Sequence, residues 1–273
     1  MKSLKIRLAN SFVRAILCML LTGCQTDIQL NLPEYKPQMV LEFYLEDNKP
    51  IKCLLQESIH FTDTIQFRLI DSAIVILSHE GINDTLQNTF YLEPQFRKVY
   101  NYFNPKIINL KPNISYSVFV KDRKGRVMTG STKLINTVQI DSVVCNFSAS
   151  GKAAAGLVFE DSGIARNFYR IVAFRNTAVI EPDSVWDISF SDILFNGRKF
   201  SFYTGYAFNT GDTVSARLYH LTEDHYKFAE SVNNAQSSNG NPFGQPANII
   251  SGLTGGIGIF STISYDQKTL LIK

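Results

Sequence analysis

A cysteine near the start of the chain has the sequence setting for covalent attachment of lipid. Leu21-Thr22-Gly23-Cys24 resembles a bacterial lipobox, in which a small residue precedes a cysteine that is acylated and becomes the mature N-terminus. The apolar run over 15–21 is far shorter than the ~20 residues that cross a bilayer. The pattern predicts a lipoprotein signal peptide over 1–23 and lipidation of Cys24, whose acyl chains hold the protein on a membrane. An ordinary cleaved signal followed by a chance cysteine is the alternative.

Two other cysteines belong to the mature chain, because Cys18 lies in the leader. Cys53 and Cys145 could form one disulfide, which an exported compartment permits. Each also lies in an apolar alternating run, where a lone cysteine is commonly a small buried hydrophobe. The sequence allows both interpretations and favours the second.

The histidines lack the spacing of a metal or catalytic site. His220 and His225 are five residues apart and straddle a predicted strand end and helix start, so they do not share one helical face as a zinc-binding pair does. We interpret them, with His60 and His79, as exposed or capping residues. The chain also has no Gly-x-Ser-x-Gly nucleophile motif. We therefore predict no metal, no cofactor and no enzyme activity.

Two further patterns resemble chemical motifs but have simpler explanations. The glycine-rich stretch 252–258 is followed by the strand-like run 259–263, whereas a phosphate loop needs a helix there. We expect these glycines to allow a bulge or close backbone packing. The neighbouring carboxylates Glu160 and Asp161 point apart on a strand, although a facing pair from distant segments stays open. We expect Asp161 to form a turn.

An aromatic surface is the remaining candidate for ligand binding. Trp186, the one tryptophan, lies in the loop-like context 182–187. Together with Tyr203, Tyr206 and Phe243 it could form a platform of the kind that binds sugars. A core or interdomain position for Trp186 is the favoured interpretation.

Charge argues against nucleic acid as a partner. The 273 residues include 27 Lys and Arg against 24 Asp and Glu, but four of these cations lie in the first 14 residues, where there is no acid. Once the leader is removed the net charge is near zero, so the basic balance belongs to the leader.

Short runs rich in Val, Ile, Phe and Tyr, separated by turn residues, indicate a mainly all-β chain. The predicted strands are 39–45, 51–55, 73–77, 86–92, 115–120, 127–134, 138–147, 155–160, 167–175, 199–206, 213–221, 257–263 and 269–272. One helix is predicted near residues 222–233, with Thr222 as its N-cap and Glu223 and Asp224 at the positive end of its dipole.

These elements are more than one sandwich of ~100 residues requires, so we predict two β-sandwich-like domains. A lipidated tether over 24–37 precedes the first domain, 38–136, which resembles fibronectin type III and immunoglobulin sandwiches. In that likeness Tyr116 is the residue of a tyrosine corner, its hydroxyl bonded to upstream backbone. The second domain, 137–273, is β-rich and contains the helix.

Several short motifs occur in an order that is similar to one family. They include Cys24 and the segments 39–45, 159–163, 167–170, 211–214, 248–252 and 255–260. Together they resemble the Bacteroidota outer-membrane lipoproteins called domain of unknown function forty-two forty-nine, over nearly the whole mature chain. The family has no established catalytic residues. Its members tend to be encoded beside TonB-dependent outer-membrane receptors, which implies an accessory role in nutrient uptake.

The expected protein is thus a non-enzymatic lipoprotein of the outer membrane, displayed at the cell surface. Gln25 supports this location, because an Asp after the cysteine retains lipoproteins in the inner membrane of enteric bacteria. Its expected partners are the membrane, through the lipid, and a TonB-dependent receptor, with a glycan or peptide as ligand. The alternatives are a glycan-binding surface module and a structural or adhesive surface subunit.

Overall fold

The computed structural model describes residues 35–60, 63–64, 66–93, 98–176, 183–238 and 248–273. The chain divides into two compact units, Met1–Lys36 and Pro37–Lys273. The second unit is built mainly of strands, with α2 (Glu223–Ser238) and the short 3₁₀ helix η1 (Asp192–Leu194). The predicted all-β fold class with one helix is confirmed. The lipobox and Cys24 lie outside the described residues.

The strands form a large and a small sheet. Their bounds are β1 Met39–Glu46, β2 Lys49–Glu57, β3 Ile74–His79, β4 Ile82–Glu93, β5 Lys98–Ile108, β6 Ser115–Lys121, β7 Val127–Lys133, β8 Ile140–Phe147, β9 Ala153–Glu160, β10 Phe168–Arg175, β11 Asp183–Ser191, β12 Lys199–Tyr203, β13 Thr213–Leu221 and β14 Ile257–Leu271. The large sheet has 11 strands in the order β11-β10-β13-β14-β1-β2-β5-β4-β3-β6-β7. The small sheet has three, β12-β9-β8.

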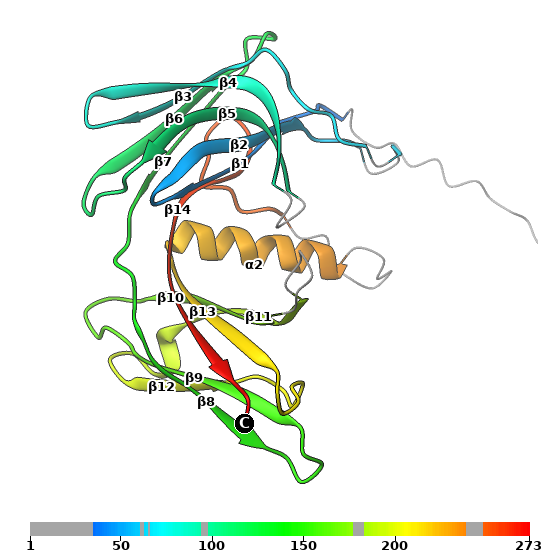
Figure 1. Cartoon of the computed structure of the whole chain (residues 1–273). Coiled ribbons are helices and arrows are strands. Elements are labelled where there is room, and N and C mark those ends of the chain that lie inside the picture. Colours follow the sequence, from blue (N-terminus) through cyan, green and yellow to red (C-terminus); the bar gives the residue numbers. More distant parts are fainter. Residues whose placement is uncertain (1–34, 61–62, 65, 94–97, 177–182, 239–247) are drawn as a thin grey trace, which may run out of the picture. The chain divides into compact units, whose positions relative to one another are not determined.

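Strand β14 lies between β13 and β1 in the large sheet and so joins β10, β11 and β13 to the N-terminal strands (Figure 1). Its first half pairs in parallel with β1, from Val40 opposite Ile257 to Glu46 opposite Ile263. Its second half pairs antiparallel with β13, from Ser264 to Leu271. One continuous strand therefore replaces the two predicted runs 257–263 and 269–272, and the polar residues between them stay in the ladder.

Glycines allow β14 to approach its neighbours closely. Gly258 has a φ of 131°, and a methyl group built on it would lie 2.0 Å from the carbonyl oxygen of Leu41. A methyl group on Gly255 would lie 2.0 Å from the carbonyl oxygen of Val127. Only glycine fits such contacts without moving the backbone. The prediction that the glycines of 252–258 serve close packing is confirmed.

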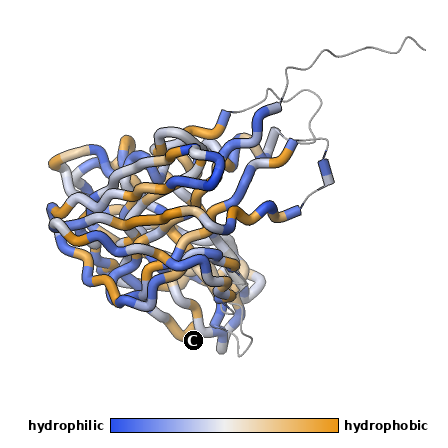
Figure 2. The backbone as a smooth tube through the Cα atoms, turned by 90° about the horizontal axis from the view of Figure 1, so that it is seen from above, coloured by the Kyte–Doolittle hydropathy of each residue, from blue (hydrophilic) through white to orange (hydrophobic). Residues whose placement is uncertain are grey.

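Strand alternation builds two main cores. In β1, Met39, Leu41, Phe43 and Leu45 are buried, while the residues between them are only partly covered. This first core lies within the N-terminal strands, and Phe260 of β14 joins it. The second core packs Leu157 and Phe159 of the small sheet against β10 and β13. Figure 2 shows the resulting interleaving of hydrophobic and hydrophilic residues along the backbone.

The tyrosine corner is present. Tyr116 at the start of β6 is completely buried, and its hydroxyl accepts a hydrogen bond of 2.8 Å from the backbone N–H of Lys111. The turn after β6 is held by Asp122, whose Oδ1 accepts from the backbone N–H of Arg126 at 2.8 Å. The tyrosine corner was expected from the sequence, and together with the Asp122 contact it fixes the entry and exit of β6.

Three local predictions were wrong. Strand β5 was not predicted, because Asn101, Asn104 and Pro105 interrupt its apolar residues. Strand β11 was interpreted as a loop around Trp186, but it pairs with β10 despite its Asp and Ser residues. Helix α2 continues to Ser238, beyond the predicted end at Asn233-Asn234, and the Ser238 hydroxyl donates to the Asn234 carbonyl at 2.9 Å.

The predicted boundary near residue 136 falls between β7 and β8. Strands from both sides of it belong to the same 11-stranded sheet, joined where β14 pairs with β1. Hydrogen bonding therefore crosses the boundary, and the division into domains 38–136 and 137–273 stays a prediction about folding units.

Replacing Gly258 by Ala should separate β14 from β1. The added methyl would meet the Leu41 carbonyl oxygen at 2.0 Å, and φ is positive, so we expect the free energy of unfolding to fall by roughly 2 kcal/mol or more. Urea denaturation of the variant measures this. Gly205→Ala is the matched control, because nothing lies within 4 Å of a methyl group there. Equal stability of the two variants would contradict the close approach.

Candidate functional site

An open pocket of about 580 Å³ lies on the polar face of the large sheet. Strand alternation selects its lining. On β13, Val214, Ala216 and Leu218 are buried in the cores, so Arg217 and Tyr219 project from the opposite face into the pocket. Residues of β1, β2, β4, β5, β10, β11 and β14 also line it, and α2 contributes His225. The pocket has the volume of a small-molecule site.

Aromatic rings hold an arginine in this pocket. The Arg217 guanidinium lies 5.0 Å from the ring centre of Phe174 and 5.1 Å from that of Tyr265. Its Nε donates to Oε1 of Gln267 at 2.6 Å. Tyr219 packs on Tyr265 with 5.1 Å between ring centres. These contacts fix the guanidinium without neutralising its charge.

Other lining cations are already paired with carboxylates. Arg170 Nε donates to Asp187 Oδ1 at 2.7 Å, and its NH2 group bonds Oδ2 of the same carboxylate. This hydrogen bonding raises the pKa of Arg170. Lys52 Nζ donates to Glu93 Oε2 at 2.7 Å and lies 4.9 Å from the ring centre of Tyr100. Such pairs orient the side chains that they join.

Helix α2 places a buried histidine at one side of the pocket. The helix begins after Thr222, whose Oγ1 accepts from the backbone N–H of His225 at 3.2 Å, so the predicted N-cap is confirmed. His225 is only 5% exposed, and its ring centre lies 5.3 Å from that of Tyr44. Its Nδ1 is buried and has no hydrogen-bond partner in the described part of the chain.

The environment keeps His225 uncharged. Burial lowers its pKa to about 4, and the positive charges of Arg170 and Lys98 act in the same direction. The interpretation of His225 as exposed or capping was wrong for its side chain. Helical spacing was the signal for it, because His225, Ala229 and Val232 fall on one face of α2, where His225 is buried and the other two are half-buried.

His220 is half-buried and lies at the edge of a separate polar network whose other side chains are buried. Its ring contacts the Asn136 carbonyl oxygen at 2.7 Å and Oδ1 of Asn167 at 3.1 Å, and burial lowers its pKa. The Asn167 amide in turn donates to Asp161 and Asp192, each at 3.2 Å. The exposed or capping interpretation was wrong here too, because this half-buried ring links the segments that contain Asn136 and Asn167.

Asp161 does more than form a turn. Its carboxylate accepts hydrogen bonds from the Tyr169 hydroxyl and, at 2.7 Å, from the backbone N–H of Gly197. Asp161 and Asp192 are thus two carboxylates brought together from distant segments, but they are 5% and 1% exposed. Because both are buried and occupied by protein donors, they hold the loops around η1 and present no open acid pair.

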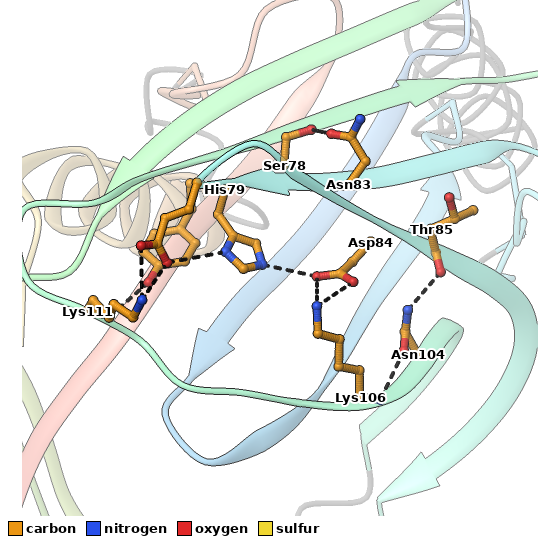
Figure 3. Close-up of polar contacts among 10 residues, drawn as sticks. Ser78, His79, Asn83, Asp84, Thr85, Asn104, Lys106 and Lys111 are labelled. Carbon is orange, nitrogen blue, oxygen red and sulfur yellow. Dashed lines mark hydrogen bonds and ion pairs between the residues drawn. The ribbon is translucent and has the colours of Figure 1, made fainter.

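His79 lies in a charged cluster on the β3–β4 hairpin (Figure 3). Its Nε2 contacts Asp84 Oδ2 at 3.0 Å, and Lys106 Nζ donates to Asp84 at 2.8 Å. Burial alone would raise the pKa of Asp84, but the hydrogen bonds from Lys106 and His79 outweigh it and lower the pKa. Ser78 bonds Asn83 at 2.7 Å and does not join the His79–Asp84 pair. The cluster clamps β3, β4 and β5 together.

The predicted aromatic surface does not assemble around Trp186. The Trp186 ring packs 5.8 Å from that of Phe202 between the sheets, and its buried Nε1 has no partner among the described residues. Tyr203, the neighbour of Phe202 on β12, points to the other face and covers Gly156. Tyr206 is 55% exposed, and Phe243 lies outside the described residues. The core position is the interpretation that this geometry fits.

The two mature-chain cysteines are free in the structure. Cys53 is buried in the first core, whereas Cys145 packs against a separate cluster around Phe208 and Val214. The side chains thus lie in different packing layers, and the disulfide that the sequence allowed does not form. Burial also raises the pKa of the Cys53 thiol.

Neither a membrane-spanning helix nor a metal-binding cluster occurs in the described ranges. Within them no helix has the length and apolarity needed to cross a membrane. Among the same residues no group of three or more His, Cys, Asp and Glu side chains is arranged to hold a metal ion.

The uncharged state of His225 should make stability depend on pH. The unfolded chain binds a proton near pH 6.5 but the folded chain only near pH 4, so stability is lost as the pH falls through this window. Between pH 6.5 and 5 the free energy of unfolding should fall in both proteins. We expect the fall to be about 1–2 kcal/mol smaller in His225→Phe than in the wild type. Urea titrations at the two pH values measure this, and each protein serves as its own reference. Identical losses would contradict a buried neutral imidazole.

Comparison with known proteins identifies the family. No curated protein matches the chain. Solved structures align with low identity: a cytokine receptor complex (8% identity, 85% of this chain and 96% of that chain, TM-score 0.27), chicken CNTN1 FN1–FN3 domains (11%, 68% and 60%, 0.26), and a DUF4785 family protein from Legionella pneumophila (13%, 66% and 52%, 0.24). A family model described as "Domain of unknown function (DUF4249)" matches residues 25–269, and the chain therefore belongs to that family.

Proposed function

We propose that this protein is a non-enzymatic, lipid-anchored binding protein of the outer-membrane surface that serves a TonB-dependent uptake receptor as an accessory. The observation that carries the binding role is the open pocket on the sheet face, with its aromatic rings and prearranged charged groups. Pockets of this volume with a few oriented polar groups are typical of ligand sites.

The sequence supports the anchoring part of the proposal. The lipobox at 21–24 follows a basic leader and a short apolar run, and Gln25 agrees with outer-membrane sorting. Membership in the DUF4249 family supports the partner, since the resemblance noted from the sequence implies TonB-dependent receptors as neighbours.

A glycan-binding module is the second candidate, and one observation favours it. Tyr219 and Tyr265 form a ring pair within the pocket, and Tyr44 and Tyr100 line its other side. Aromatic faces of this kind stack on sugar rings. In this candidate the pocket tyrosines form the surface that contacts the sugar, and Trp186 does not, because it packs between the sheets.

Substituting Cys24 tests the anchor. We expect metabolic labelling with palmitate to mark the wild-type chain and to be absent from Cys24→Ala, which should leave the membrane fraction because its acyl chains are missing. Cys145→Ala is the matched control and should be labelled like the wild type, because Cys145 is a half-buried free cysteine far from the lipobox in sequence.

Copurification from detergent-solubilised outer membranes tests the partner. We expect the wild-type chain to bring down a TonB-dependent receptor. An unlabelled wild-type protein in the soluble fraction, or a labelled one that brings down no such receptor, would refute the corresponding part of the proposal.

A further inference from the structure

The lining of the pocket has an excess of positive charge. Five cationic side chains and three carboxylates face it. The cations come from β2, β5, β10 and β13 and are Lys49, Lys52, Lys98, Arg170 and Arg217. Since the mature chain as a whole is nearly neutral, this concentration of cations is a local property of the pocket.

Three of these five cations have a carboxylate partner, whereas Lys49 and Arg217 have none in the part of the chain that the structure describes. Lys52 and Arg170 are bonded to Glu93 and Asp187, and Lys98 lies 4.0 Å from Glu42 at the edge of the pocket. Arg217 has no ion pair within the described ranges. Its only polar contacts there are Oε1 of Gln267 at 2.6 Å and the Tyr219 hydroxyl at 3.4 Å.

The surroundings of Arg217 leave it ready for an anion. Phe174 and Tyr265 contact the guanidinium and limit its motion, so little side-chain entropy is lost when a ligand binds. The Nε–H is used by Gln267, while the outer N–H groups retain donor capacity. A planar guanidinium presented this way matches the two oxygens of a carboxylate.

An independent observation points to a ligand in the same pocket. His225 lines it, is 5% exposed, and carries a buried Nδ1 without a partner in the described structure. Buried polar atoms in native proteins almost always have a partner, so an orphan beside a pocket calls for a missing one. As the Nδ1–H tautomer, His225 can donate to a ligand oxygen, and Arg170 and Lys98 are the nearby positive charges.

We propose that the pocket binds a small solute carrying carboxylate groups, with Arg217 as the anchor for one carboxylate and His225 as a donor to a further ligand oxygen. The inference rests on the pocket's role in the proposed function. It adds the chemical class of the ligand: an acidic saccharide or an acidic peptide supplies the same carboxylate, and tyrosine faces beside Arg217 accommodate the rest of either solute.

Calorimetric titration of the full chain in detergent tests the inference. The probes are trigalacturonate, the tripeptide Glu-Glu-Glu and neutral maltotriose. We expect an acidic probe to bind more tightly than maltotriose, and we expect its binding to weaken as the ionic strength rises. Binding of trigalacturonate alone identifies a saccharide ligand, and binding of the tripeptide alone identifies a peptide ligand.

Variants assign the anchor. Arg217→Gln should weaken binding of the acidic probe by about tenfold or more, because a charge-assisted bidentate contact is lost. Arg217→Lys keeps the positive charge but loses the paired N–H donors of the guanidinium, and it should weaken binding less than Arg217→Gln does. The matched control, Arg123→Gln, removes an exposed arginine of the β6–β7 turn and should bind like the wild type.

Three results would overturn the inference. They are failure of both acidic probes to bind, equal affinity for maltotriose, and unchanged affinity in Arg217→Gln with intact circular dichroism. If maltotriose binds and its binding depends on Tyr219, the ligand is not recognised by its carboxylate, but the proposed binding function is retained. Calorimetry reports only on ligand binding. A failure of the anchor or partner proposal appears instead in the palmitate labelling and copurification experiments, so the two kinds of failure can be distinguished.

Discussion

The parallel pairing of β14 with β1 is the constraint on which the rest of the unit depends. It joins β10, β11 and β13 to the N-terminal strands in one hydrogen-bonded sheet. Polar side chains of β14 strengthen the junction: Thr262 Oγ1 donates to the Lys133 carbonyl at 2.9 Å, and Ser264 contacts Thr137 at 2.7 Å. Because the chain between β7 and β8 is tied to β14 in this way, the segment at the predicted domain boundary is held against the sheet.

The same pairing creates the pocket. Tyr44 and Tyr265 are far apart in sequence and line the same hollow because β1 and β14 are adjacent in the sheet. The pocket face is unusual in that rings and charges alternate along it. Arg170 lies 5.7 Å from the Tyr219 ring centre, and Lys98 lies 5.6 Å from that of Tyr44. Each such contact stabilises by only about 0.5–1 kcal/mol where exposed, so their main effect is to orient the side chains.

Local features of the fold could be predicted from the sequence, whereas the site could not. The Tyr116 corner, the Thr222 cap and the glycines at 255 and 258 depend on neighbours in the chain or on one residue's conformational freedom. Such effects leave a short sequence signature. The pocket residues come from eight strands and a helix, and their meeting depends on a strand order that no local pattern encodes.

The order of the strands also has a consequence for the biogenesis of the protein. Val40 pairs with Ile257, and Phe43 packs on Phe260 with 5.0 Å between ring centres, so the first core acquires one of its walls from a strand made much later. During synthesis from the N-terminus, Leu41 and Phe43 stay exposed until that strand emerges. Contacts of such long sequence separation form slowly. The topology thereby delays completion of the first core until nearly the whole chain has been made, and the apolar residues of β1 depend on protection from aggregation until then.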